Sequence, residues 1–318
     1  MLEGTSDAVG GIIPAGRVPS PPRRRPKDWR RREAVLGGLF IGPALLGVIG
    51  LALVPFGFVI WYGFHNWQPL IGEFTWIGLD NYIRLFQDGQ VWNALRNTFV
   101  FALLLLVLNV SLALALAVML NRPFRGRAVF RAIFFLPVIV SSVAWVLIWE
   151  FLVAYNGGIN GALQVLGIPP VNWLREPATA LATVVVIQVF KGVGMNMILF
   201  LAALQNVPND LIEAARIDGA GAFRRFRSVV LPLLTPTVLM VMIITIIGAM
   251  DVFVPIQVLT AGGPGNSTTV ISYLVYRTAF GDQEFGYASV LGVLMFVIVL
   301  TLTLVQWSTR KRWVHDEV

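Results

Sequence analysis

Long apolar runs alternate with short polar segments along this chain of 318 residues. A helix needs about 20 apolar residues to cross the hydrocarbon core of a bilayer. The first apolar run is interrupted by Pro43 and Pro55, whereas the second contains only Asn109 and Ser111 as polar residues. The sufficiently long runs cover residues 34–64, 99–120, 129–153, 178–204, 233–259 and 287–307. The pattern therefore predicts an all-α integral membrane protein with six transmembrane helices.

Composition agrees with a membrane protein and narrows the possible chemistry. Hydrophobic residues make up 57% of the chain and charged residues only 13%, a balance that soluble domains do not show. The chain has no Cys, and its two histidines, His65 and His315, are too few for a zinc site. We therefore expect no disulfide and no metal site. The net charge of +7 raises the possibility of a nucleic-acid partner, but the basic residues gather between the apolar runs, where membrane topology explains them.

The basic residues also predict the orientation. Arg84, Arg96, Arg175 and Arg277 lie on one side of the predicted membrane, and Lys191 lies inside the fourth run. The rest of the 24 Lys and Arg residues lie on the other side. The positive-inside rule places that side, with both termini, in the cytoplasm. On the outer side, the loop positions Gln68, Asn160 and Ser267 are expected to be exposed.

The domain organisation follows from the same pattern. Residues 34–308 are predicted to form one six-helix transmembrane domain, followed by a cytoplasmic tail, 309–318. Residues 1–33 form a basic cytoplasmic tail that is expected to be disordered, because it is rich in Gly, Pro, Ser and Arg and lacks periodicity. Its RRRPKDWRRRE run precedes an apolar region too long for a signal-peptide core, so the first run is interpreted as a retained anchor.

The most polar part between the runs is the segment EAARIDGAGAFRRFRSVVLPLLTP, residues 213–236. Two short helices are predicted in the loop 205–231: acidic residues after Pro208 favour a helix start, and Gly219 permits a sharp turn between the two. Pro232 marks the beginning of the fifth run. The pattern G-x-x-x-x-G-K-[ST] of ATP-binding loops occurs nowhere in the chain. The chain is therefore not expected to hydrolyse ATP itself.

This segment resembles the EAA loop of permease subunits from binding-protein-dependent ABC importers. The resemblance rests on Glu213, Ala214 and Ala215, on Gly219, and on the residues 229–232, where Val229 replaces the usual Ile. Over residues 34–308 the chain is similar to the branch typified by MalF, LacF and UgpA. That similarity is carried by IGLDNY (77–82), FKG (190–192), LAALQ (201–205), LTAGGP (259–264) and FGYAS (285–289).

The resemblance implies a particular assembly in a bacterial or archaeal cytoplasmic (inner) membrane. A second permease forms a heterodimer with this chain, two ATP-binding cassette subunits bind ATP and Mg, and an extracytoplasmic solute-binding protein delivers the solute. This chain would bind no cofactor. The helix before the EAA turn would dock into an ATPase subunit, although a solvated loop is the simpler alternative. The coupling residues implied are Glu213, Ala214, Ala215, Asp218, Gly219, Leu231 and Pro232.

Two ionisable residues lie deep in predicted spans, Lys191 in the fourth and Asp251 in the fifth, and such residues are functional candidates by default. The resemblance implies that stretches 191–196 and 248–252 form the sugar site. Met195, Asn196 and Asp251 are the favoured contacts, with Gly192 and Gly194 giving room for a ligand. A structural pair between Lys191 and Asp251 is equally compatible with the sequence. Trp145, Trp149 and Glu150 fit an interfacial belt better than a sugar site.

The function implied is ATP-driven import of a sugar or oligosaccharide. The same importer type carrying glycerol 3-phosphate or a glycerophosphodiester is an alternative. From another class, a stand-alone secondary transporter would need no EAA loop and would show an internal repeat of spans. An intramembrane enzyme is disfavoured, since the runs contain no Ser-His or His-Asp constellation.

Overall fold

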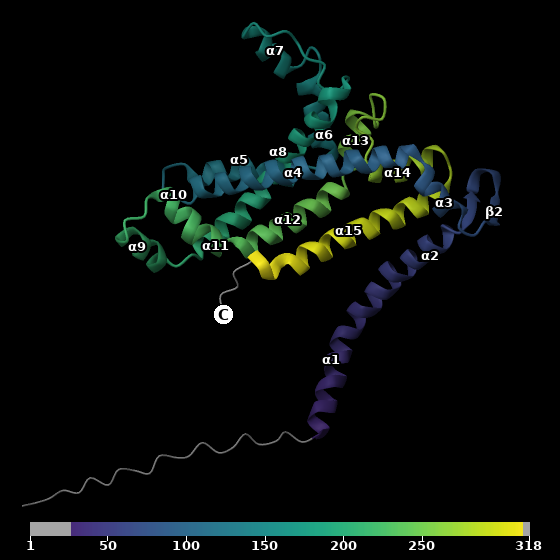
Figure 1. Cartoon of the computed structure of the whole chain (residues 1–318), viewed down its shortest axis with the longest axis horizontal. Coiled ribbons are helices and arrows are strands. Elements are labelled where there is room, and N and C mark those ends of the chain that lie inside the picture. The colour runs from purple at the N-terminus through teal and green to yellow at the C-terminus, as the bar shows by residue number, and fades with distance from the viewer. Residues whose placement is uncertain (1–26, 314–318) are drawn as a thin grey trace, which may run out of the picture. The chain divides into compact units, whose positions relative to one another are not determined.

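The structure, a computed structural model, describes the backbone of residues 27–313 and the side chains of residues 36–310 (Figure 1). Most of the two predicted tails, residues 1–26 and 314–318, lies outside the described residues. Contacts between residues divide the chain into two compact units, Met1–Phe56 and Gly57–Val318. The features discussed below for function all belong to the second unit.

The first apolar run forms helix α1 (Lys27–Val48), a π-helical turn (Ile49–Leu53) and α2 (Val54–Tyr62). Pro55 lies at the beginning of α2 and has no N–H for the carbonyl four residues earlier. The widened turn immediately before it is a common way to accommodate such a missing bond. The candidate membrane span Leu36–Tyr62 has none of its most apolar window buried within the chain.

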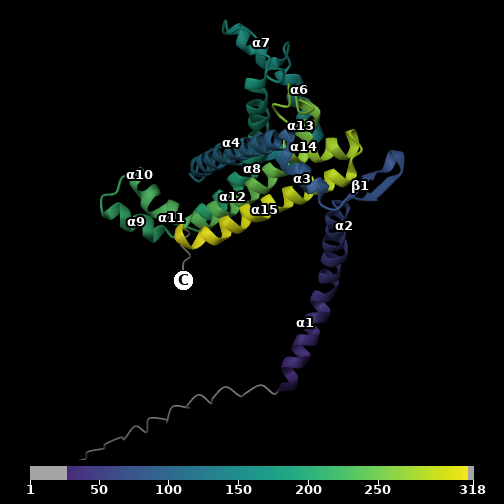
Figure 2. The same cartoon turned by 45° about the vertical axis from the view of Figure 1, so that its right-hand side comes forward.

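The second unit is built on four long helices: α4 (Gly89–Leu120), α8 (Pro177–Gln205), α12 (Thr235–Met250) and α15 (Phe285–Trp313). Helix α4 packs against α8 and α12, and α12 also packs against α15, as Figures 1 and 2 both show. Asp88 caps α4 by accepting a hydrogen bond from the Gln90 amide at 2.8 Å, and Pro177 opens α8 at a position where proline is favoured.

Shorter elements connect these long helices. They are α3 (Asp80–Gln87), α5 (Arg127–Ile139), α6 (Ser142–Val153), α7 (Gly158–Val165), α9 (Asn209–Ile217), α10 (Ala222–Arg225), a π-helical turn (Phe226–Val230), α11 (Leu231–Leu233), α13 (Val254–Leu259), α14 (Ile271–Tyr276) and a second π-helical turn (Arg277–Gly281).

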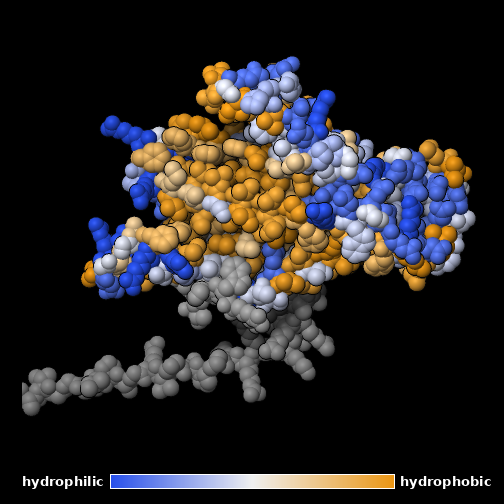
Figure 3. Space-filling model, turned by 45° about the horizontal axis from the view of Figure 1, so that its top comes forward, coloured by the Kyte–Doolittle hydropathy of each residue, from blue (hydrophilic) through white to orange (hydrophobic). Residues whose placement is uncertain are grey.

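The helical membrane class predicted from the sequence is confirmed. Among the described residues, five helices are long and apolar enough to cross a membrane, and a sixth span results if the bent pair Ala222–Leu233 and Thr235–Met250 is counted as one. Figure 3 shows one face on which hydrophobic side chains form a broad continuous area, with hydrophilic side chains gathered at its margins. Which side of the membrane each loop occupies stays a prediction.

Two expected spans are interrupted. The third is not a single helix over 129–153, because α5 ends at Ile139, and Val140 and Ser141 are extended before α6 begins. Ser141 then caps α6 by accepting a hydrogen bond from the Ala144 amide, an alternative to helix continuation that serine favours. The fifth is interrupted after Met250, and α13 restarts the helix at Val254. A hydrophobicity pattern does not predict such breaks, because the interruptions at 140–141 and 251–253 contain only one polar residue each.

The expectation of an all-α chain is wrong at one place. Strands β1 (His65–Gln68) and β2 (Glu73–Trp76) form an antiparallel hairpin with His65 opposite Trp76. Gly72 closes the connection in the left-handed region at φ 68°. The segment is rich in aromatic residues, which favour strands, but it is too short and too polar to count as a membrane run.

Two of the resemblance motifs outside the EAA loop, IGLDNY and FGYAS, contact this hairpin. Asn81, in the IGLDNY motif, is buried and donates from Nδ2 to the carbonyls of Gly63 and His65, both at 3.0 Å. Gly286, in the FGYAS motif, lets α15 approach the hairpin so closely that a Cβ there would lie 2.0 Å from the His65 oxygen. These motif residues therefore have packing roles in this chain.

Two of the outer loop positions are not exposed as expected. Asn160 is fully buried, and the Ser267 hydroxyl oxygen is also inaccessible to solvent. The reason at Asn160 is that its amide makes several hydrogen bonds to neighbouring loop segments. A polar residue in a loop is therefore no guarantee of exposure.

Candidate functional site

Helix α9 ends in a well-formed turn that contains most of the EAA residues. The amide of Gly219 donates to the Arg216 carbonyl at 3.1 Å, and the amide of Ala220 donates to the Ala215 carbonyl at 3.0 Å. This pair of bonds is a Schellman motif, which needs a left-handed residue just after the helix. Gly219 supplies it at φ 78°. The expected sharp turn at Gly219 is therefore confirmed.

The surface of this turn is exposed and partly apolar. Glu213, Ala214 and Asp218 are exposed, and Ala215 is half-buried beneath them. Ile217 and Phe223 are 86% and 76% exposed, and Leu211 is 44% exposed. The sequence analysis did not single out Leu211 or Ile217. The sequence could have indicated both residues, because they are large apolar residues in a short, charged helix outside the membrane runs. Exposed apolar patches of this kind often mark contacts with other proteins.

A continuous helical segment connects the turn to the membrane helices. The guanidinium of Arg225 donates from Nη1 to the Ala220 carbonyl at 2.8 Å and so ties α10 to the turn. The chain then passes through Phe226–Val230 and α11 and bends by 68° into α12. Leu231 and Pro232 are half-buried at this bend, next to the fully buried Leu234. The turn is therefore joined to the start of α12 through α10 and α11.

Lys191 has a different partner from the one considered in the sequence analysis. Its Nζ donates to the Pro137 carbonyl at 2.8 Å and also to the Val140 carbonyl. These carbonyls lie at the carboxyl end of α5, where a helix leaves acceptors without partners and where a positive charge is favourable. Among the described residues, Lys191 and Asp251 form no ion pair, so the structural-pair hypothesis is wrong. Lys191 instead caps the broken third span.

The two glycines near Lys191 bring helices together instead of leaving room for a ligand. A Cβ at Gly194 would lie 1.9 Å from the Phe134 oxygen of α5, and one at Gly192 would lie 3.1 Å from Nδ2 of Asn109 on α4. Helix α8 continues without a break past both positions. The expected helix irregularity at these glycines is therefore not observed.

Asn196 joins three helices. It is buried, and its Nδ2 donates to Asn109 Oδ1 of α4 at 2.6 Å and to Thr245 Oγ1 of α12 at 3.2 Å. Asn109 in turn donates to the Val189 carbonyl at 3.3 Å. Buried polar groups joined in this way fix how helices pack. The amide of Asn196 is thus fully engaged within the chain.

The other proposed substrate contacts lie apart from this network. Met195 is 46% exposed, and Asp251 is exposed directly after the last residue of α12. No hydrogen bond within the described part of the chain connects either side chain to Asn196. The structure therefore leaves Met195 and Asp251 free for a ligand and gives Asn196 a packing contact.

The helices and the capped turn together define a multi-span membrane protein with an ordered helical element outside its spans. The family described as the inner membrane component of binding-protein-dependent transport systems matches residues 109–313. The trehalose/maltose transport system permease protein MalF of Thermococcus litoralis is 38% identical over 275 residues, covering 86% of this chain and 93% of that protein. The diacetylchitobiose uptake system permease protein NgcF of Streptomyces coelicolor is 36% identical over 314 residues, covering 92% and 88%.

A solved structure supports the fold. A chain of a bacterial alginate ABC transporter, in complex with an alginate pentasaccharide-bound periplasmic protein, aligns with a TM-score of 0.79 at 23% identity. The alignment covers 92% of this chain and 99% of that one. This chain belongs to the family of binding-protein-dependent transport system inner membrane components. It is a permease subunit of an ABC transporter, a non-catalytic membrane component.

Proposed function

We propose that the chain translocates a sugar or oligosaccharide into the cell, as one half of a heterodimeric permease. The observation that carries the proposal is the capped turn at Gly219, which presents exposed apolar residues beside a direct helical link to α12. The substrate class rests on the relatives, which transport trehalose and maltose, diacetylchitobiose and lactose. A relative at 29% identity transports sn-glycerol 3-phosphate, which makes that solute the comparison to test.

The proposed assembly follows from the family. Two ATP-binding cassette subunits hold ATP and Mg, and one of them receives α9 with Leu211, Ile217 and Phe223 in an apolar contact. An extracytoplasmic binding protein delivers the solute on the opposite side of a bacterial or archaeal cytoplasmic membrane. The bound periplasmic protein in the alginate transporter structure supports this arrangement.

The proposed mechanism uses the helical link described above. Closure of the ATPase pair moves α9, and the segment from Ala222 to Leu233 transmits that movement to α12 across the 68° bend. Helix α12 packs against α4, α8 and α15, so its movement changes the packing of the whole bundle. Two alternative packings, each open to one side, are what alternating access requires. A stand-alone secondary transporter has no ATPase subunit and therefore needs no EAA loop to contact one.

Reconstitution tests the function directly. The chain is placed in vesicles with its partner permease, ATPase subunits and binding protein, and uptake of maltose, trehalose, lactose, diacetylchitobiose and glycerol 3-phosphate is measured. We expect ATP-dependent uptake of at least one saccharide and none of glycerol 3-phosphate. Uptake of glycerol 3-phosphate and of no saccharide would show that the chain imports glycerol 3-phosphate instead of a sugar. Saccharide uptake without ATP or without the ATPase subunits would overturn the proposal of an ATP-driven importer.

The orientation has a separate test, because the chain contains no cysteine. Single Cys substitutions at Arg125 or Phe223 are expected to be protected from an impermeant maleimide in intact cells, and those at Gln68 or Gln164 to be labelled. Gln164 replaces the buried Asn160 as a reporter because it is exposed on α7. Both sets are compared in permeabilised cells that lack the ATPase subunits, where all four should react because the proposed contact of Phe223 is then uncovered. The reverse pattern in intact cells would overturn the predicted orientation.

The substrate pathway is tested with two substitutions that the structure distinguishes. Asp251→Asn is expected to lower uptake while leaving assembly and thermal stability unchanged, because Asp251 is exposed and its side chain makes no hydrogen bond within the described structure. Asn196→Ala is expected to lower stability by about 1–3 kcal/mol, since it leaves the buried Asn109 oxygen without a donor. Asp282→Asn, at another exposed carboxylate, serves as the control. Unchanged uptake in Asp251→Asn would remove Asp251 from the pathway.

A further inference from the structure

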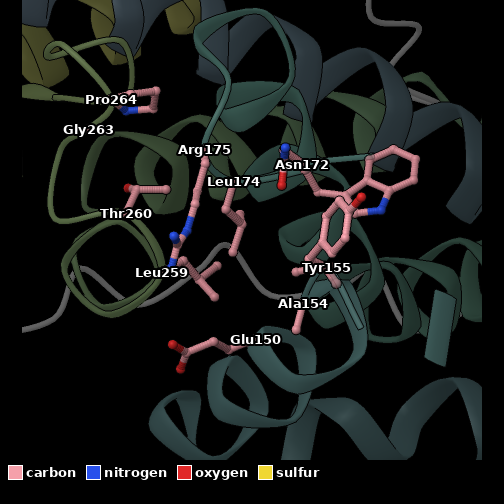
Figure 4. A pocket seen from close by; sticks show the side chains of 12 residues that line it. Glu150, Ala154, Tyr155, Asn172, Leu174, Arg175, Leu259, Thr260, Gly263 and Pro264 are labelled. Atoms are coloured by element: carbon pink, nitrogen blue, oxygen red, sulfur yellow. The ribbon is translucent and has the colours of Figure 1, made fainter. Parts of the chain in front are cut away.

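A cavity of about 610 Å³ lies at one end of the helix bundle, away from Lys191 and Asn196. Three segments that are distant in the sequence surround it: the last turn of α6, the loop leading into α8, and the chain after α13. Figure 4 shows the Arg175 side chain reaching toward Leu259, with the Glu150 carboxylate below it and the Tyr155 ring across the opening. All three segments are on the predicted outer side of the membrane.

Four of the polar side chains that line this cavity make no contacts that hold the fold together. Within the described part of the chain, the side chains of Glu150, Tyr155, Asn172 and Arg175 make no hydrogen bond, and Glu150 and Arg175 form no ion pair. All four residues are exposed. They offer a carboxylate, a phenol, an amide and a guanidinium to the same space, so both donors and acceptors are available to a ligand.

The backbone that carries these side chains is held firmly. The buried amide of Asn160 donates to the carbonyls of Tyr155 at 3.1 Å and Val171 at 3.0 Å, and it accepts from the Val171 amide and from Trp173 Nε1. The Trp173 carbonyl also accepts a hydrogen bond from Thr179 Oγ1 at 3.0 Å. One wall of the cavity is therefore ordered before any ligand arrives, which lowers the entropy lost on binding.

The apolar part of the lining completes a ligand site. Val153 and Leu259 are buried beneath the opening, and Trp173 and Tyr155 contribute aromatic surface. Leu259 belongs to a hydrophobic cluster with Ile256 and Val252, and Asp251 is not among the residues that line the cavity. Binding sites for small molecules combine such an apolar concave surface with a few polar groups that fix orientation.

We propose that this cavity is an outer carbohydrate site, distinct from the pathway around Asp251, that holds the saccharide on the outer side before the bundle opens. The proposal rests on the proposed function of sugar import. Vicinal hydroxyls of a sugar ring both donate and accept, so they match the paired donors and acceptors of Glu150, Asn172 and Arg175. The C–H faces of the ring match the aromatic surfaces of Tyr155 and Trp173. The volume is ample for a disaccharide.

Protection of a single cysteine tests the site. Ala154→Cys, at an exposed position of the cavity lining that supplies no polar side chain to the site, is introduced into the otherwise cysteine-free chain, and the full transporter is reconstituted without binding protein in right-side-out vesicles. Labelling of this subunit by an impermeant maleimide is then timed with maltose, trehalose, lactose or diacetylchitobiose, and with mannitol, which has no ring. We expect the imported disaccharide to slow labelling about tenfold at ten times its dissociation constant, and mannitol to have no effect.

Matched variants separate a site from a general change in shape. Labelling of Gln164→Cys, on the neighbouring helix α7, should be unaffected by any sugar. Protection at position 154 should be lost in Glu150→Gln, in Asn172→Ala and in Arg175→Ala, but kept in Glu176→Gln and Arg96→Ala, which change exposed residues outside the cavity lining. Asn160→Ala should weaken protection, because the backbone of Tyr155 and Val171 then loses the amide that holds it.

The outcomes distinguish this proposal from the proposed function. Uptake of a disaccharide that does not protect Cys at position 154 would overturn the outer site and leave the importer intact. Protection by all the disaccharides and by mannitol alike would also overturn it, as would a Cys that is unreactive in the assembled transporter with or without sugar, since a partner would then fill the cavity. Failure of every disaccharide to be imported would overturn the substrate class instead.

Discussion

Gly219→Val is expected to leave the protein in the membrane and to abolish solute-stimulated ATP hydrolysis and uptake. Gly219 adopts φ 78°, which costs an L-residue roughly 1–2 kcal/mol and a β-branched residue more. No atom lies within 4 Å of the position that a Cβ would take. The cost therefore comes from the backbone conformation alone, and the chain can relieve it by giving up the Schellman bonds that end α9.

Loss of those bonds changes the direction in which α9 points from the bundle. The proposed contact between α9 and the ATPase subunit tolerates little displacement, because van der Waals attraction between packed atoms weakens steeply when they move apart by an ångström. Solute-stimulated ATP hydrolysis in reconstituted vesicles measures the coupling, and the amount of assembled complex is measured beside it. Gly219→Asn is the matched control, since Asn accepts the left-handed conformation, and it should retain most of the activity.

Glu213→Lys tests the same surface through charge. Glu213 is exposed on α9, so its reversal leaves the fold of this chain unchanged and acts only on a partner. Removing one partner of a desolvated ion pair costs about 2–5 kcal/mol, whereas an exposed contact costs much less. Normal transport by vesicles that contain the protein with both Gly219→Val and Glu213→Lys would contradict the proposal that α9 and its turn couple an ATPase subunit to the membrane helices.

Lys191→Met is expected to destabilise the protein and to lower uptake strongly. The ammonium group satisfies the carbonyls of Pro137 and Val140 at the break between α5 and α6. Methionine has a similar length but no donor, so two acceptors lose their partner inside a membrane span, at about 1–3 kcal/mol each. Thermal unfolding of the purified complex and uptake in vesicles measure the two effects. Lys191→Arg, which keeps donors and charge, should recover part of both.

The same residue provides a test against the Lys–Asp pair. If Lys191 and Asp251 neutralised each other, Lys191→Met combined with Asp251→Ala would be more stable than Lys191→Met alone. The structure predicts no such rescue, since Lys191 bonds two backbone carbonyls and the Asp251 side chain makes no hydrogen bond within the described residues, so the effects of the two changes should add. Recovery of assembly in the double variant would show that the capping role assigned to Lys191 is wrong.

Much of the coupling turn could be predicted from the sequence because its determinants are local. Residues within a few positions of one another determine where α9 ends, that Gly219 is left-handed, and where the next helix begins. Known preferences for helix ends and turns therefore predict these features from the sequence. The interior of the spans was less predictable. Gly192, Gly194 and Asn196 were assigned to a substrate path, yet each contacts another helix.

The sequence by itself determined the membrane class, the position of the apolar runs and the turn that follows α9, because hydrophobicity and turn preferences are properties of short segments. Only the tertiary structure decided what Lys191 binds, where the third and fifth spans break, and that Asn160 orders the wall of a cavity. Lys191 caps carbonyls more than fifty positions earlier in the chain. Such a contact depends on which backbone groups a broken helix leaves unpaired and on which side chain the packing brings close to them. Composition and periodicity therefore cannot predict it.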